Sequence, residues 1–267
     1  MSIGRSALGK GKSATVSRGG LRWRLDLNEG IDFAIYLLGA FERSTVNTLE
    51  KLVKPGDVVF DIGANIGAHT LGLARSVGPA GRVFAFEPAD FAFAKLQANL
   101  ALNPELDART FPRQILLSAS AAKPPENEIY ASWPLEAANA VHPKHRGVLV
   151  STKGAAVDTL DLFVEREGLE RLDFIKMDVD GHELPVLQGG LGTLKRFRPI
   201  LVMELSPYVH REHHHDFAVF VALLRQAGYS LQDAKNWNPL PLHAAKLEAL
   251  IPDGASINAI AKPAAGN

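Results

Sequence analysis

The sequence predicts an α/β fold, with one mostly parallel, seven-stranded sheet and helices on both of its faces. Apolar strand-like runs alternate with helical patterns along most of the 267 residues, as is typical of a doubly wound sheet. Residues 58–88 contain an apolar strand, a glycine-containing turn, a helix and a second strand that ends in an acid. This arrangement is half of a nucleotide-binding unit. Hydrophobic residues make up 46% of the chain, which is enough to fill a core.

The first strand of this unit is the buried apolar run 58–60, which Asp61 closes. Gly63 and Gly67 follow, and glycine lets the backbone turn sharply and approach a ligand closely. Residues 67–76 are expected to form a helix whose first N–H groups face the crevice at the sheet edge.

Residues 82–86 form the next predicted strand, and Glu87 stands at its carboxyl end. A carboxylate at this place suits the two hydroxyls of a ribose. A dinucleotide fingerprint needs three glycines, whereas Gly63, Asn65 and Ala68 occupy the three positions here. Asn65 obstructs the close approach of a pyrophosphate, but an S-adenosyl ligand has no phosphate at this point. The alternative of a plain tight turn is disfavoured, since the acid follows at the expected spacing of about 20 residues.

The remaining elements follow from periodicity and from breakers such as the Lys54–Asp57 turn and Asn103-Pro104. Helices are expected over 32–38, 44–52, 91–102, 160–167, 183–197 and 216–227. Strands are expected over 113–118, 128–132, 147–152, 173–177, 200–205, 229–233 and 256–261, with the last one pairing beside 229–233 as an edge.

The chain is expected to contain one large domain over 57–262. Residues 1–20 are basic, contain no acid and lack the apolar core of a secretory signal, so we expect a flexible tail. Residues 21–56 are interpreted as a helical entry segment. Residues 119–157 interrupt the regular alternation, and this insert is interpreted equally well as a lid that recognises substrate or as a decorative hairpin.

Composition limits the classes of partner. Lys plus Arg and Asp plus Glu both number 29, so no global field favours nucleic acid or an anionic membrane. No apolar run reaches the ~18 residues of a membrane-spanning helix, and we expect a cytoplasmic protein. The chain has no cysteine, which excludes disulfides and thiolate metal sites. Nothing in the sequence indicates an oligomeric state.

Three motifs resemble one known family. The first is DIGANIGAHT at 61–70 with FEP and LQANLALN after it, and the second joins VDTLDLF, LDFIKMDVDGHELPVLQGG and RPILVMEL between 157 and 205. The third is LLGAFE, ending at Glu42. Together they resemble the FkbM-type family of S-adenosylmethionine-dependent methyltransferases, collinearly over roughly residues 35–230. Asp180 stands where that family usually has Glu.

The resemblance implies a Rossmann-like class I methyltransferase fold that binds S-adenosylmethionine. Asp61, Gly63, Asn65 and Gly67 are assigned to the amino-acid and ribose side, and Glu87 to the ribose diol. Many related enzymes have an acid after the third strand, but LLSASAAK at 116–123 has none, so adenine recognition is assigned to Ser118 or nearby groups. The full set of expected cofactor contacts is Glu42, Asp61, Gly63, Ala64, Asn65, Gly67, Glu87, Pro88 and Ser118.

The catalytic candidates lie at the ends of two later strands. Alternation places Lys176, Asp178 and Asp180 on one face of a strand, where buried charges are costly unless they are paired or used. Asp178 or Glu204 is the expected base for an alcohol acceptor. A divalent cation on Asp178 with Asp180 or Glu204 is an alternative that the sequence does not indicate. Lys176 is expected to hold a carboxylate of the acceptor or to steady Asp178, and structural ion pairing is the alternative role.

His182 is the last catalytic candidate, and capping of the following helix is an equally good interpretation. His210 and His213–His215 do not have metal-ligand spacing, so no metal site is assigned and a solvated helix entry is expected. The leading function is S-adenosylmethionine-dependent O-methylation of a small-molecule or glycan-like acceptor. The alternatives are an NAD-dependent oxidoreductase and a non-catalytic cofactor-binding module.

Overall fold

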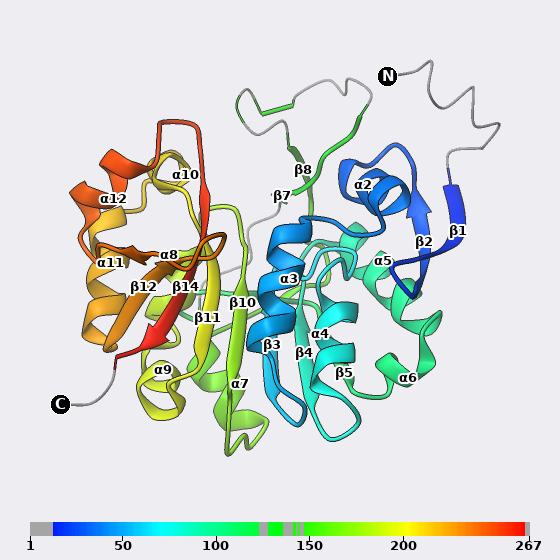
Figure 1. The fold of residues 1–267 in the computed structure, drawn as a ribbon, viewed down its shortest axis with the longest axis horizontal. Coiled ribbons are helices and arrows are strands. Elements are labelled where there is room, and N and C mark those ends of the chain that lie inside the picture. Colours follow the sequence, from blue (N-terminus) through cyan, green and yellow to red (C-terminus); the bar gives the residue numbers. More distant parts are fainter. Residues whose placement is uncertain (1–12, 123–127, 136–140, 143, 145–146, 265–267) are drawn as a thin grey trace.

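The computed structural model describes residues 13–122, 128–135, 141–142, 144 and 147–264. Its centre is an eight-stranded sheet (Figure 1). In spatial order the strands are β13 (Pro239–Leu240), β12 (Tyr229–Asp233), β14 (Ile257–Pro263), β11 (Ile200–Leu205), β10 (Phe174–Met177), β3 (Val58–Ile62), β4 (Arg82–Phe86) and β5 (Thr110–Arg113). The five strands from β11 to β5 are mutually parallel, and β14 is antiparallel to both of its neighbours. The predicted seven-stranded, mostly parallel sheet is confirmed, with the two-residue β13 added at one edge.

Helices cover both faces of this sheet. They are α2 (Gly30–Leu38), α3 (Arg43–Leu52), α4 (Thr70–Val77), α5 (Asp90–Ala101), α6 (Pro104–Asp107), α7 (Leu160–Arg166), α8 (Glu183–Gln188), α9 (Leu191–Phe197), α10 (Pro207–Glu212), α11 (Phe217–Gln226) and α12 (Ala244–Leu250). Strand alternation divides the core: Val59 and Val83 pack with α3 and α4, while Phe60 and Phe84 pack with α7. No helix in the described part of the chain is long and apolar enough to cross a membrane.

The N-terminal region is more ordered than expected. Within the segment predicted to be a flexible tail, Ser13–Arg18 forms β1 and pairs in antiparallel fashion with β2 (Leu21–Asp26); residues 1–12 lie outside the described ranges. Trp23 is 2% exposed, so the hairpin has a packed face. Asp32 joins the hairpin to the domain, because its carboxylate accepts hydrogen bonds from the Asp26 amide and from Lys95 of α5.

Three expected elements are corrected. The third strand of the sheet is β5, whereas Ile115–Leu117 forms β6 and leaves the sheet to pair with β9 (Ala156–Asp158). The expected helix over 183–197 is two helices, α8 and α9, because Gly189 and Gly190 interrupt it. A Cβ atom on Gly189 would lie 2.1 Å from the Ser118 carbonyl oxygen, so this junction packs directly on the chain after β6. The third correction is that β14 lies between β11 and β12 and is not an edge.

The insert over 119–157 contains an antiparallel hairpin of β7 (Glu128–Ser132) and β8 (Val148–Ser151). Both strands were expected from the sequence. Residues 134–144, between these two strands, lie only partly within the described residues. In Figure 1 the hairpin rises from the edge of the sheet where the strands β3, β4 and β10 end.

The turn after β3 depends on Gly63. Its φ is +78°, and a Cβ atom there would lie 1.9 Å from the Asp178 carbonyl oxygen. We expect Gly63→Ala to lower the free energy of unfolding by ~1–3 kcal/mol through backbone strain. The clash between two strand ends adds to this loss. Chemical denaturation of the purified protein measures this loss.

Gly72→Ala is the matched control. Gly72 lies inside α4, and a Cβ atom there would meet nothing within 4 Å. We expect this variant to be more stable than wild type by ~0.5–1 kcal/mol, since alanine loses less backbone entropy in a helix. Equal effects of the two substitutions would contradict the role given to Gly63.

Candidate functional site

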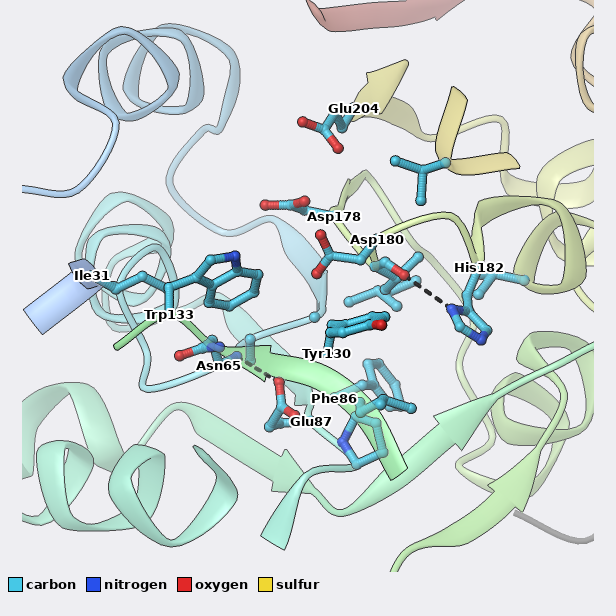
Figure 2. A pocket seen from close by; sticks show the side chains of 18 of the residues that line it. Ile31, Asn65, Phe86, Glu87, Tyr130, Trp133, Asp178, Asp180, His182 and Glu204 are labelled. Atoms are coloured by element: carbon cyan, nitrogen blue, oxygen red, sulfur yellow. Dashed lines mark hydrogen bonds between the residues drawn. The ribbon is translucent and has the colours of Figure 1, made fainter. Parts of the chain in front are cut away.

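A cavity of about 820 Å³ opens where the strands β3, β4, β10 and β11 end (Figure 2). This is the carboxyl edge of the sheet, where ligands of such folds bind. Of the residues expected at a site, those that line the cavity are Glu42, Gly63, Ala64, Asn65, Glu87, Pro88, Lys176, Asp178, His182 and Glu204. The sequence therefore identified residues from five separate segments that the fold brings to one cavity.

Glu87 organises the turn after β3. Its two carboxylate oxygens accept hydrogen bonds from the amides of Asn65, at 2.8 Å, and Ala89, at 2.9 Å. Asn65 has φ +48°, a left-handed conformation that asparagine tolerates better than most residues. Each carboxylate oxygen can accept one further hydrogen bond. Burial raises the pKa of Glu87 to about 7.

Lys176 lies under the cavity floor and is only 3% exposed. The parallel register sets it opposite Asp61, and its ammonium nitrogen Nζ is 3.3 Å from Asp61 Oδ1 and 3.8 Å from Asp178 Oδ2. It also donates a hydrogen bond of 2.8 Å to the Gly63 carbonyl. Burial acts to lower the pKa of Lys176, but the charges of Asp61 and Asp178 outweigh it and raise this pKa.

Three carboxyl groups, from the turn after β10 and the end of β11, lie together on one side of the cavity. They belong to Asp178, Asp180 and Glu204 (Figure 2). Burial raises the pKa of all three groups, well above the usual range for Asp180 and to about 8 for Glu204. For Asp178 the charge of Lys176 opposes this shift. With a pKa of about 8, Glu204 is mostly protonated at neutral pH.

Asp180 reaches this group by a turn and not by strand alternation. The strand β10 ends at Met177, and Asp180 has φ +47°. The expectation that alternation places Lys176, Asp178 and Asp180 on one face of a strand is wrong, because the strand contains only Lys176 of the three. The turn after the strand nevertheless brings Asp178 and Asp180 to the same cavity.

Three expected cofactor contacts do not line the cavity: Asp61, Gly67 and Ser118. Asp61 is fully buried and holds Lys176 and the Thr70 hydroxyl, the latter at 2.6 Å. A Cβ atom on Gly67 would lie 3.0 Å from Leu96, so Gly67 faces α5. The chain after β6 turns Ser118 toward Gly189, and the apolar residues 115–117 line the cavity in its place.

Other cavity residues were missed from the sequence. His69, at the start of α4, is buried, and both of its ring nitrogens lack a hydrogen-bond partner among the described residues. Its Nε2 lies 3.7 Å from Glu42 Oε2. His69 could have been identified from the DIGANIGAHT motif, because it stands just before a helix whose first residues were expected to face the crevice. Tyr130 and Trp133 of the insert also line the cavity, and no motif marked them.

His210, inside α10, differs from the expected solvated helix entry. His210 is fully buried, with Nε2 3.4 Å from Glu183 Oε2, and burial lowers its pKa to about 4. The rings of His182 and His213 lie 4.5 Å apart between centroids. His182 stands at the start of α8, but its side chain does not cap that helix. Within the described ranges, no group of three or more ligand side chains is arranged to hold a metal ion.

The raised pKa of Glu204 predicts a pH-dependent stability. Between its ordinary value of 4.5 and about 8, the folded protein holds this proton more tightly than the unfolded chain does. Raising the pH through this range therefore removes stability. A glutamine side chain has no such proton to lose. We therefore expect the free energy of unfolding of Glu204→Gln to increase relative to that of wild type as the pH rises from 4.5 to about 8. Denaturation across this range measures the difference, and a constant offset between the two proteins would contradict it.

Comparisons with known proteins agree with this geometry. Residues 61–231, more than half of the chain, match the model of the methyltransferase FkbM domain. The hexuronic acid methyltransferase AglP of Haloferax volcanii is 30% identical over 164 residues, which cover 60% of this chain and 61% of that protein. The methyltransferase sdnD of Sordaria araneosa is 31% identical over 163 residues, which cover 49% of this chain and 59% of that protein.

A shorter match is to the 31-O-demethyl-FK506 methyltransferase FkbM of Streptomyces tacrolimicus, which is 55% identical over 47 residues, 18% of each chain. The chain thus spans about three fifths of the length of the first two relatives. The domain match includes the turn after β3, Glu87, and the acidic residues that follow β10. The chain belongs to the FkbM methyltransferase family.

Proposed function

We propose that the protein transfers the methyl group of S-adenosylmethionine to an oxygen of a small-molecule or glycan acceptor. The observation that carries this proposal is the arrangement of one cavity, with Glu87 and its turn on one side and Asp178, Asp180 and Glu204 on the other. The first side suits a ribose, and the second suits a hydroxyl that must lose its proton.

The cavity fits the cofactor chemically. Glu87 has accepting capacity left for the ribose hydroxyls, and Pro88 with the apolar residues 115–117 offers a border for adenine. Six acidic residues and two lysines line the cavity: Glu42, Glu87, Glu128, Asp178, Asp180, Glu204, Lys144 and Lys176. This excess of acid groups suits a ligand that carries a sulfonium charge.

Methyl transfer is an in-line displacement, so the protein has to align the acceptor oxygen and remove its proton. We assign the base to Asp178, with Glu204 as the next candidate. The raised pKa of Asp178 brings its proton exchange toward neutral pH. Lys176 is 3.8 Å from Asp178 and holds it in place. His182 lies at the rim, where it can contact the acceptor.

An NAD-dependent oxidoreductase is less well supported. The Asn65 amide, which would meet a pyrophosphate, already donates to Glu87. Glu87 also brings negative charge to the point where a phosphate would lie. A cofactor-binding module without catalysis is disfavoured by the buried acidic groups beyond the cofactor side, because they are costly to keep unless they are used.

Ligand binding tests the cofactor. We expect S-adenosylhomocysteine to bind the purified protein and NAD not to bind, as measured by calorimetry. Glu87→Gln should weaken the binding at least tenfold, because it loses charge-assisted hydrogen bonds worth ~1.5–3 kcal/mol. Glu105→Ala, on the exposed surface of α6, is the control and should bind as wild type does. Binding of NAD alone would sink the proposal.

The charges also restrict the acceptor. Lys176 is neutralised by Asp61 and Asp178, and Lys144 lies 3.5 Å from both Glu212 and Asp253. A carboxylate on the acceptor would therefore meet the acid groups without a free cation among the described lining residues. We propose an uncharged or cationic acceptor, which differs from what the name of the Haloferax relative states.

A matched set of acceptors tests this point. A hexoside, the corresponding amino sugar and the corresponding hexuronic acid are incubated with S-adenosylmethionine labelled in its methyl group. We expect transfer to the uncharged or cationic members at least tenfold faster than to the acid, and Asp178→Asn should abolish transfer while it keeps cofactor binding. Faster labelling of the hexuronic acid would contradict the charge argument.

A further inference from the structure

Two segments about one hundred residues apart are joined at the mouth of the cavity. Glu29, just before α2, accepts hydrogen bonds from the Ser132 hydroxyl, at 3.0 Å to each carboxylate oxygen, and from the Trp133 amide at 3.1 Å. The backbones add two bonds: the Gly30 amide to the Trp133 carbonyl, at 2.8 Å, and the Leu135 amide to the Asn28 carbonyl, at 2.7 Å. We call residues 28–30 and 132–135 together the clasp.

The clasp forms part of the cavity wall. Gly30, Ile31 and Trp133 line the cavity, whereas Glu29 does not. In Figure 2 the Trp133 ring extends from beside Ile31 toward the middle of the cavity, on the side of Asn65. The two segments fit closely at Gly30, because a Cβ atom there would lie 3.1 Å from the Trp133 carbonyl oxygen and one of the two would have to shift.

We propose that Glu29 is a positioning residue that holds Trp133 against the bound cofactor, so that the N-terminal segment and the insert close the cavity as one unit. This inference rests on the proposed function, since it requires the cofactor to occupy this cavity. Glu29 does not line the cavity and acts through Trp133. Among the described residues, its carboxylate accepts hydrogen bonds from the Ser132 hydroxyl and the Trp133 amide, and of these two residues Trp133 lines the cavity.

Charge chemistry explains why an acid is needed at this position. A carboxylate has two accepting oxygens and no donor, so it can serve the Ser132 hydroxyl and the Trp133 amide at the same time. Glutamine has a single accepting oxygen without a full charge, and its NH2 group donates and cannot accept from a backbone N–H. Alanine leaves both donors without this partner. The three side chains at position 29 therefore form a graded series.

The test is titration of S-adenosylhomocysteine into wild type, Glu29→Gln, Glu29→Ala and Trp133→Phe, followed by calorimetry and by tryptophan emission. Glu105→Ala is the control for loss of one negative charge from an exposed position. Thermal melting of each ligand-free protein separates folding from binding. Trp23 is buried in the N-terminal core, and the Trp133→Phe variant shows which part of the emission change belongs to Trp133.

We expect ligand to change the emission of wild type and not that of Trp133→Phe. Glu29→Ala should bind roughly tenfold more weakly, the value of about one charge-assisted hydrogen bond, and Glu29→Gln should lie between it and wild type. Glu105→Ala should match wild type in both readouts. If Glu29→Ala does not fold, Glu29→Gln and Trp133→Phe carry the test.

Two results would overturn the inference: unchanged affinity in the folded Glu29 variants, or an emission change that persists in Trp133→Phe. A lower melting temperature with unchanged affinity belongs to the first result and would mean that the clasp only stabilises the fold. Failure of wild type to bind the ligand at all would instead overturn the proposed function, and this inference with it.

Discussion

The site depends on the buried contact between Lys176 of β10 and Asp61 of β3. A charged pair in the core is costly unless each member has further partners, and here each has them. Asp61 accepts a hydrogen bond from Thr70 at the start of α4, and Lys176 donates to the Gly63 carbonyl in the turn and faces Asp178. One interaction thus connects two central strands, the cofactor turn, the first helix of the unit and the proposed base.

This contact also determines the electrostatics of the cavity. Asp61 neutralises the charge of Lys176 before any ligand binds. Little of this positive charge therefore remains to act on the three acids above it. Burial then raises the pKa values of Asp178, Asp180 and Glu204. A carboxylate with a raised pKa is, in its ionised form, a stronger base toward a hydroxyl than an exposed carboxylate is. Among the described lining residues, no lysine without an acidic partner is left to pair with an anionic acceptor.

The sequence predicted what local patterns encode. The sheet, its helices, the turn at Gly63 and the carboxylate at Glu87 follow from periodicity, from glycine conformation and from strand ends. Direct cofactor contacts were expected for Asp61, Gly67 and Ser118, but the structure places all three outside the cavity lining for one reason. Nearness to a motif does not say which way a side chain points. Asp61 points beneath the cavity floor and Gly67 packs on Leu96, while Ser118 sits behind an apolar strand that leaves the sheet.

Contacts between distant segments could not be predicted from the sequence, for a different reason. Glu29 stands in an ordinary polar stretch and Trp133 in an insert without a motif, and only the folded chain brings them together. The cavity consequently has two halves of different origin. One half comes from the strand ends that carry the family motifs, and the other from the clasp. Because residues 28–30 of the clasp lie outside residues 61–231, the family match covers the first half of the cavity and only the insert side of the clasp.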